Sequence, residues 1–224
     1  MSASRQHAHD LRRGDSVLPA WVKEAGRALL APVVRVALAL HITPNTVTVI
    51  GFGLTVLAAG VVASGGLLPG AAILVAGSLL DAVDGALARA KGGGTPFGGF
   101  LDSTLDRAGE AILYIGIAGY FLTHGAQPTW PVLLAFAALA GSFLVSYSRA
   151  RAEGIGLTAS VGLAPRTERL VLAIAGLGLA GLGFGPGLIG ALAVIGLLTV
   201  ATVVQRIWHV WHQSQSAADD TKET

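Results

Sequence analysis

The chain has 224 residues, of which 53% are hydrophobic and only 12% are charged. This charged fraction and a mean hydropathy of +0.66 exclude an ordinary soluble domain, in which about a quarter of the residues are charged. The net charge of +2 gives no reason to expect a nucleic-acid partner, and the absence of cysteine excludes disulfides and thiolate metal sites.

The N-terminal region precedes the first long apolar run. Residues 1–16 are polar and predict a tail, whereas residues 17–41 mix apolar side chains with Lys23, Glu24 and Arg27. Such a segment predicts an amphipathic helix lying in the membrane interface. A further membrane span is the alternative, and the charges in the segment count against it.

Apolar runs of about 20 residues, the length that crosses a bilayer, then occur six times. They predict helices at about 44–64, 69–90, 98–122, 129–152, 168–184 and 187–209. Lipid cannot satisfy open backbone groups, so every span should be helical. The predicted fold is an all-α integral membrane protein with a six-helix domain at 42–212 and a polar C-terminal tail at 213–224.

Lysine and arginine are distributed unevenly between the two ends of these helices. The first, third and fifth connections hold none, whereas the N-terminal region, the second and fourth connections and the C-terminal end hold several. Positive charge stays on the cytoplasmic side. The distribution predicts a multi-pass protein of the cell membrane with both termini in the cytoplasm.

Four aspartates lie at the cytoplasmic ends of the second and third predicted helices. Asp81 and Asp84 are three residues apart, and Asp102 and Asp106 are four apart, so each pair shares one helix face. A short glycine-rich turn joins the two helices, which makes them antiparallel neighbours. The four carboxylates should therefore converge just inside the membrane surface.

A carboxylate-rich site of this kind suits Mg²⁺ or Mn²⁺, and four carboxylates are enough for the two metals of a phosphoryl-transfer site. One buried aspartate could instead be structural, and two could form a proton relay. A divalent-cation transporter is the alternative from another class. Transporters usually carry polar residues deeper in several spans, so acids gathered at one rim favour an enzyme.

Small and basic residues surround the acids. Gly85, Gly98 and Gly99 would let a ligand approach the backbone, although close helix packing explains small residues equally well. Arg89 could neutralise a phosphate or anchor its helix at the membrane interface.

The spacing Asp81-x-x-Asp84-Gly85-x-x-Ala88-Arg89, followed by Gly98-x-x-x-Asp102-x-x-x-Asp106, resembles the signature of the CDP-alcohol phosphatidyltransferase family. The TPNTVT segment at 43–48 is similar to that family as well. The resemblance implies transfer of a phosphatidyl group from CDP-diacylglycerol to an alcohol, with release of CMP. It also implies a homodimer.

The resemblance further implies roles for individual residues. It assigns metal binding to Asp81, Asp84, Asp102 and Asp106, and proton acceptance to Asp106. The expected contacts to the CDP-lipid are Asn45, Thr48, Gly85, Ala88, Arg89 and Thr95.

A second cluster bears on the acceptor alcohol. Ser146, Arg149, Arg169 and Arg206 come from three predicted helices and could meet on the cytoplasmic side. Guanidinium groups suit a phosphate, although arginines also hold topology. Arg206 lies within an apolar run, which predicts an anionic partner.

These positions resemble the acceptor pocket of a subgroup that uses inositol 1-phosphate. The sequence departs from that subgroup at Arg149, where lysine is frequent, and in the APRTERL segment at 164–170. Glycerol-3-phosphate is the rival acceptor.

Overall fold

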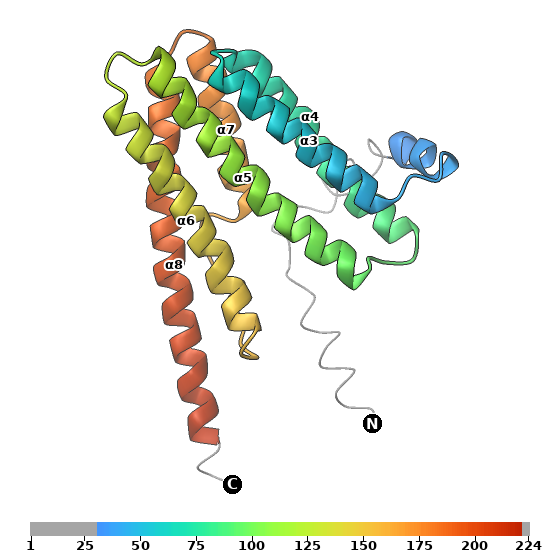
Figure 1. The fold of residues 1–224 in the computed structure, drawn as a ribbon. Helices are drawn as coiled ribbons and strands as arrows, with labels where there is room; N and C mark the ends of the chain where they lie inside the picture. The colour runs from blue at the N-terminus through green and yellow to red at the C-terminus, as the bar shows by residue number, and fades with distance from the viewer. Residues whose placement is uncertain (1–30, 221–224) are drawn as a thin grey trace.

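The structure is a computed structural model that describes residues 31–220. All regular secondary structure in this part of the chain is helical (Figure 1), as predicted. After helical turns over residues 31–39, the helices are α3 Pro44–Ala63, α4 Leu67–Ala90, α5 Pro96–His124, α6 Thr129–Glu153, α7 Arg166–Gly181 and α8 Pro186–Asp220.

Four of these helices, α3, α4, α6 and α8, are long and apolar enough to cross a membrane. Helix α7 has 16 residues, and the first half of α5 carries the charged side chains of Asp102, Asp106, Arg107 and Glu110. The six predicted helices are therefore present, whereas a membrane crossing by α5 and α7 remains an expectation.

Local capping signals explain where the second helix of the acid-carrying hairpin begins. Thr95 caps α5 because its side chain accepts a hydrogen bond from the backbone nitrogen of Gly98, and Pro96 occupies the first helical position. Thr43 and Pro44 begin α3 in the same way. Residues 91–95 alone separate α4 from α5, so the start of α5 lies close to the end of α4.

Helices α3, α4 and α5 form one group and α6, α7 and α8 form another; contacts of α5 with α6 and of α4 with α7 join the two groups (Figure 1). Leu74, Leu113 and Leu192 belong to one buried cluster that spans both groups. At Gly116, a Cβ atom would lie 2.5 Å from the carbonyl oxygen of Ala59, so the glycine lets α3 and α5 approach closely. This contact fixes the distance between the helices that carry the site.

The structure describes much less of the N-terminal segment than of the C-terminal one. The predicted tail at 1–16 and most of the predicted interfacial helix at 17–41 lie outside the described residues. Helix α8 runs beyond its predicted end at 209 as far as Asp220. The first part of the predicted polar tail is therefore a continuation of the last helix.

Candidate active site

The end of α4 and the start of α5 bring the four aspartates into one electrostatic cluster. The negative charges of Asp81 and Asp102 repel that of Asp84, and the same two charges repel Asp106. Asp84 is buried, and the hydroxyl of Thr48 on α3 donates to its Oδ2 at 2.7 Å. The four acids therefore lie near enough to repel one another, and Thr48 orients one of them.

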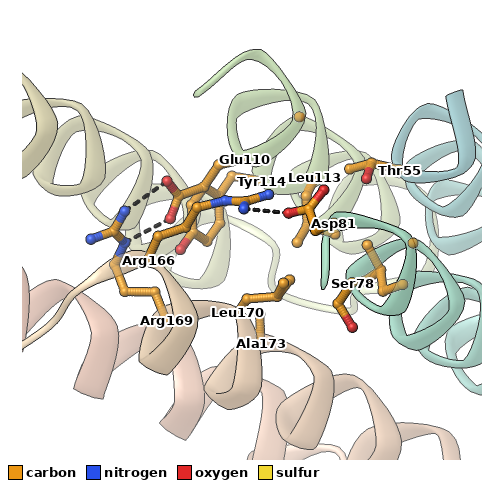
Figure 2. Close-up of a pocket in the computed structure, with 13 residues that line it drawn as sticks. Thr55, Ser78, Asp81, Glu110, Leu113, Tyr114, Arg166, Arg169, Leu170 and Ala173 are labelled. Carbon is orange, nitrogen blue, oxygen red and sulfur yellow. Dashed lines mark hydrogen bonds and ion pairs between the residues drawn. The ribbon is translucent and has the colours of Figure 1, made fainter. Parts of the chain in front are cut away.

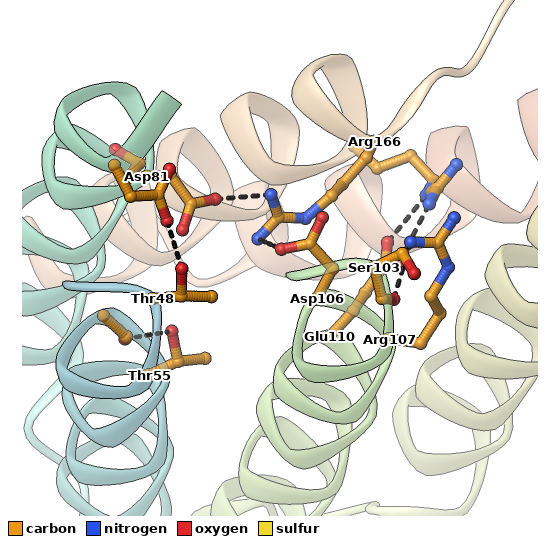
Figure 3. A network of polar contacts seen from close by, with 12 residues as sticks. Thr48, Thr55, Asp81, Ser103, Asp106, Arg107, Glu110 and Arg166 are labelled. Carbon is orange, nitrogen blue, oxygen red and sulfur yellow. Dashed lines mark hydrogen bonds and ion pairs between the residues drawn. The ribbon is translucent and has the colours of Figure 1, made fainter. Parts of the chain in front are cut away.

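Arg166, the first residue of α7, lies between two of these acids (Figure 3). Its Nη1 is 2.5 Å from Oδ2 of Asp81, and its Nη2 is 3.0 Å from Oδ1 of Asp106. Within residues 31–220, no group of three or more histidine or acidic side chains is arranged to hold a metal ion. The donor chemistry of four carboxylates suits a divalent cation, and metal binding by these aspartates stays a prediction.

A cavity of about 390 Å³ opens beside Asp84 and Asp102. Its walls include five of the residues predicted to contact the CDP-lipid, namely Asn45, Thr48, Gly85, Ala88 and Thr95. Arg89, the sixth, is not among the lining residues. Lys91 was not predicted; it lines the cavity and donates from Nζ to the carbonyl oxygen of Ile42 at 2.8 Å. A volume of this size is typical of a small-molecule site.

Arg169 is the most deeply buried of the predicted acceptor residues, with 1% of its side chain exposed. Its Nε and Nη2 donate to the two carboxylate oxygens of Glu110 on α5 at 2.6 and 2.8 Å (Figure 2), and its Nη1 donates to the carbonyl oxygen of Ala164. This bidentate pair fixes α7 against α5. Asp81, Arg166 and the pair line one enclosed cavity of about 30 Å³, which is room for about one water molecule.

The other predicted acceptor residues lie on α6 and α8. Arg206 is buried and donates from Nε to the carbonyl oxygen of Val161 at 2.9 Å and from Nη1 to that of Val145. The positive charges of Arg149 and Arg169 both act on it. Ser146 is half-buried beside Val145. Three helices thus bring the predicted basic residues together, and an anion from outside the chain remains the predicted partner of Arg206.

Helix α8 also holds the segment that leads into α7. Thr202 Oγ1 accepts from the backbone nitrogens of Leu163 and Ala164 at 3.1 and 3.0 Å, and Gln213 bonds to Thr158. Gly162 has a φ of +145°, and a Cβ atom there would lie 2.3 Å from Thr202. These contacts on one face of α8 therefore set the point at which α7 begins, and with it the position of Arg166.

This contact predicts that Thr202→Val lowers stability by about 1–3 kcal/mol, because the buried N–H of Ala164 and the partly buried N–H of Leu163 lose their acceptor. Thermal unfolding in detergent, together with proteolysis of the 154–165 segment, measures the effect. Thr199→Val is the matched control. Thr199 is equally buried, but its hydroxyl donates only within α8, to Gly196 at 2.8 Å. Equal unfolding temperatures for the two variants would contradict the assignment.

Residues 41–212 match the family described as CDP-alcohol phosphatidyltransferase. The chain belongs to this family. The match covers the whole of the predicted six-helix domain, and it confirms the resemblance seen in the spacing from Asp81 to Asp106. The chain is thus an enzyme, which decides against a divalent-cation transporter.

Two curated relatives of the phosphatidyltransferase have names that share one part of the product. This chain is 35% identical over 185 residues to the phosphatidylinositol phosphate synthase of Corynebacterium glutamicum. The match covers 82% of this chain and 84% of that protein. The chain is 39% identical over 181 residues to the archaetidylinositol phosphate synthase of Methanothermobacter thermautotrophicus, with coverage of 78% and 89%. Both names contain inositol phosphate and differ in the lipid.

Solved structures agree with the fold of the phosphatidyltransferase. The phosphatidylinositol phosphate synthase of Mycobacterium tuberculosis with CDP-DAG bound matches with a TM-score of 0.77 at 33% identity, over 82% of this chain and 94% of that chain. A structure of the same enzyme in complex with manganese and citrate matches with a TM-score of 0.77 over 81% and 88%.

Two features of the site were missed or left open by the sequence. Lys91 stands in a glycine-rich turn that gives no signal for a contact with Ile42. Arg166 lies in the APRTERL segment at 164–170, which the sequence singled out only as a departure from the subgroup. Its spacing of three from Arg169 places both on one face of α7, and this is the signal that could have directed both toward the acids.

Proposed function

We propose that this phosphatidyltransferase transfers the phosphatidyl group of CDP-diacylglycerol to inositol 1-phosphate and releases CMP, which gives phosphatidylinositol phosphate. The observation that carries the proposal is the cavity beside Asp84 and Asp102, walled by the residues expected at the nucleotide. It opens next to the acids, where a diphosphate would lie if the cytidine occupies the cavity.

The acceptor is supported by the basic residues on α6, α7 and α8 and by the relatives. The positive charges of Arg149 and Arg169 act on Arg206, whose guanidinium donates to the carbonyl oxygens of Val161 and Val145. The phosphate of an acceptor would supply an anionic partner there. Relatives from a bacterium and an archaeon share inositol phosphate in their names while their lipids differ. Glycerol-3-phosphate is the second candidate, because it is also an anionic alcohol.

In the proposed reaction, Asp106 accepts the proton of the attacking hydroxyl. The hydroxyl oxygen forms a bond to the phosphorus that carries the diacylglycerol, the bond from that phosphorus to the CMP oxygen breaks, and CMP leaves. Asp81, Asp84, Asp102 and Asp106 would hold two divalent cations, Mg²⁺ or Mn²⁺, which neutralise the diphosphate and stabilise charge on the phosphorus. A manganese-bound structure of a relative supports a divalent metal.

The proposed setting is the cell membrane, with six spans, both termini and the active site on the cytoplasmic side, and a homodimer. The basic connections support this orientation, since the connections 64–66, 125–128 and 182–185 lack lysine and arginine. Acyl chains could stay in the lipid while the nucleotide stays in water.

A CMP-release assay tests the proposal. The purified enzyme receives CDP-diacylglycerol with inositol 1-phosphate, free inositol, glycerol-3-phosphate or serine in separate reactions. We expect the fastest turnover with inositol 1-phosphate and loss of activity when divalent cations are chelated. Equal or faster turnover with glycerol-3-phosphate would contradict the proposal and identify glycerol-3-phosphate as the acceptor.

A further inference from the structure

Arg166 bridges α4 and α5 through one planar guanidinium group. Its two terminal nitrogens contact Asp81 on α4 and Asp106 on α5 at 2.5 and 3.0 Å (Figure 3). The contact of Nη1 with Asp81 is a charge-assisted hydrogen bond, which is the stronger kind, and the contact of Nη2 with Asp106 is an ion pair. The contact therefore stabilises a particular arrangement of the two acids.

The bridge also answers an electrostatic difficulty at the site. Four carboxylates repel one another, and such a group of like charges needs a counter-charge. Arg166 supplies one from within the chain, and its positive charge acts on Asp102 as well as on Asp106. A divalent cation would satisfy the same need, and it would have to use the same carboxylates.

We propose that Arg166 is an internal counter-cation that competes with the divalent metal for Asp81 and Asp106. The proposal rests on the metal binding put forward in the proposed function. It assigns Arg166 two positions: paired with the acids when the metal is absent, and displaced from them when the metal binds.

Exposure indicates which arginine of α7 can move in this way. The Arg166 side chain is 38% exposed, so its own charge can move into water. The carboxylate of Asp106, which is 15% exposed, would then have the metal as its partner. Arg169, one turn later, is 1% exposed and bonded to both oxygens of Glu110. The fixed pair of Arg169 holds α7 in place while the side chain of Arg166 turns.

The test is a titration of the metal-free protein with Mn²⁺, with the free ion followed by electron paramagnetic resonance. We expect Arg166→Gln to bind Mn²⁺ about tenfold more tightly than the wild type, the size expected when a hydrogen-bonded charge stops competing for a ligand. In the absence of metal the variant should unfold at a lower temperature than the wild type, and Mn²⁺ should raise its unfolding temperature by more.

Arg107→Gln is the matched control. Arg107 stands next to Asp106 in the chain and acts on it electrostatically, but its Nη1 donates to the carbonyl oxygen of Ser103 at 2.6 Å. Its removal lowers the local positive charge without removing a bond to an acid. The proposal expects a clearly smaller change in Mn²⁺ affinity from this variant.

Each outcome decides between the two proposals. Equal or weaker Mn²⁺ binding by Arg166→Gln overturns the competition and leaves the proposed function intact. Absence of Mn²⁺ binding in the wild type removes the metal site, and the competition with it. If Arg166→Gln does not fold, Arg166→Lys replaces it: a lysine cannot bridge both acids, so an Mn²⁺ affinity identical to that of the wild type would overturn the proposal.

Discussion

Asp106→Asn is expected to abolish CMP release, by at least about 100-fold, while leaving the binding of CDP-diacylglycerol intact. An amide keeps the size of the side chain but accepts no proton, and general bases contribute about 10²–10⁴ to a rate. Binding should survive because Asp106 is not among the residues that line the cavity beside Asp84. The two measurements are single-turnover CMP release and the shift of the unfolding temperature produced by the CDP-lipid.

Ser103→Ala serves as the control for Asp106→Asn. Ser103 lies on the same helix, nearly one turn earlier, and its hydroxyl donates to the carbonyl oxygen of Phe100 at 2.9 Å. This variant should retain activity. Activity like that of the wild type in Asp106→Asn would eliminate Asp106 as the base. Loss of CDP-lipid binding in that variant would indicate a role in holding the nucleotide.

Arg169→Met should lower stability by about 3–5 kcal/mol, because it leaves the largely buried carboxylate of Glu110 without its partner. Glu110 is 12% exposed and accepts two of the hydrogen bonds of Arg169. For a chain of this length, the expected fall in unfolding temperature in detergent is roughly 6–20 °C. Replacing Glu110 with leucine in the same protein should recover much of this loss, since no unpaired charge then remains.

Arg149→Met is the matched control for this prediction. Arg149 also pairs with a glutamate, at 2.9 Å from Glu153, but both side chains are more than half exposed, at 54% and 55%. Exposed pairs contribute about 0–1 kcal/mol, so this variant should unfold at nearly the wild-type temperature. Equal stability of the two variants, with a raised KM for the acceptor only in Arg169→Met, would contradict the structural role and support the predicted role of Arg169 as a phosphate ligand.

The helices and the position of the acids could be predicted from the sequence. Each predicted helix is present within a few residues of its expected bounds at the N-terminal end, since apolar runs and threonine–proline starts such as Thr95-Pro96 are local signals. Spacings of three and four within a helix also placed Asp81 beside Asp84 and Asp102 beside Asp106. The end of α8 was missed, because a polar helix extending from an apolar one has no hydrophobic pattern to announce it.

The partners of the arginines could not be predicted, because they depend on how α7 is placed against α4 and α5. The chain distance from Arg166 to Asp81 is 85 residues and from Arg169 to Glu110 is 59 residues, and helix periodicity carries no information over such separations. The sequence assigned Arg169 to the acceptor pocket and gave Arg166 no such role. In the structure one is a buried structural cation and the other a half-buried bridge between two acids.

The sequence by itself determined the chemistry of this enzyme: four carboxylates on a helical hairpin at one rim of an apolar bundle, in the spacing of its family. The tertiary structure decided which cation contacts those carboxylates. The hydrogen bonds of α8 to the segment before α7, together with the Arg169–Glu110 pair, fix the position of α7 and therefore of Arg166. Side-chain spacing within a helix is set by the backbone repeat alone, whereas contacts between helices are set by packing that involves the whole bundle.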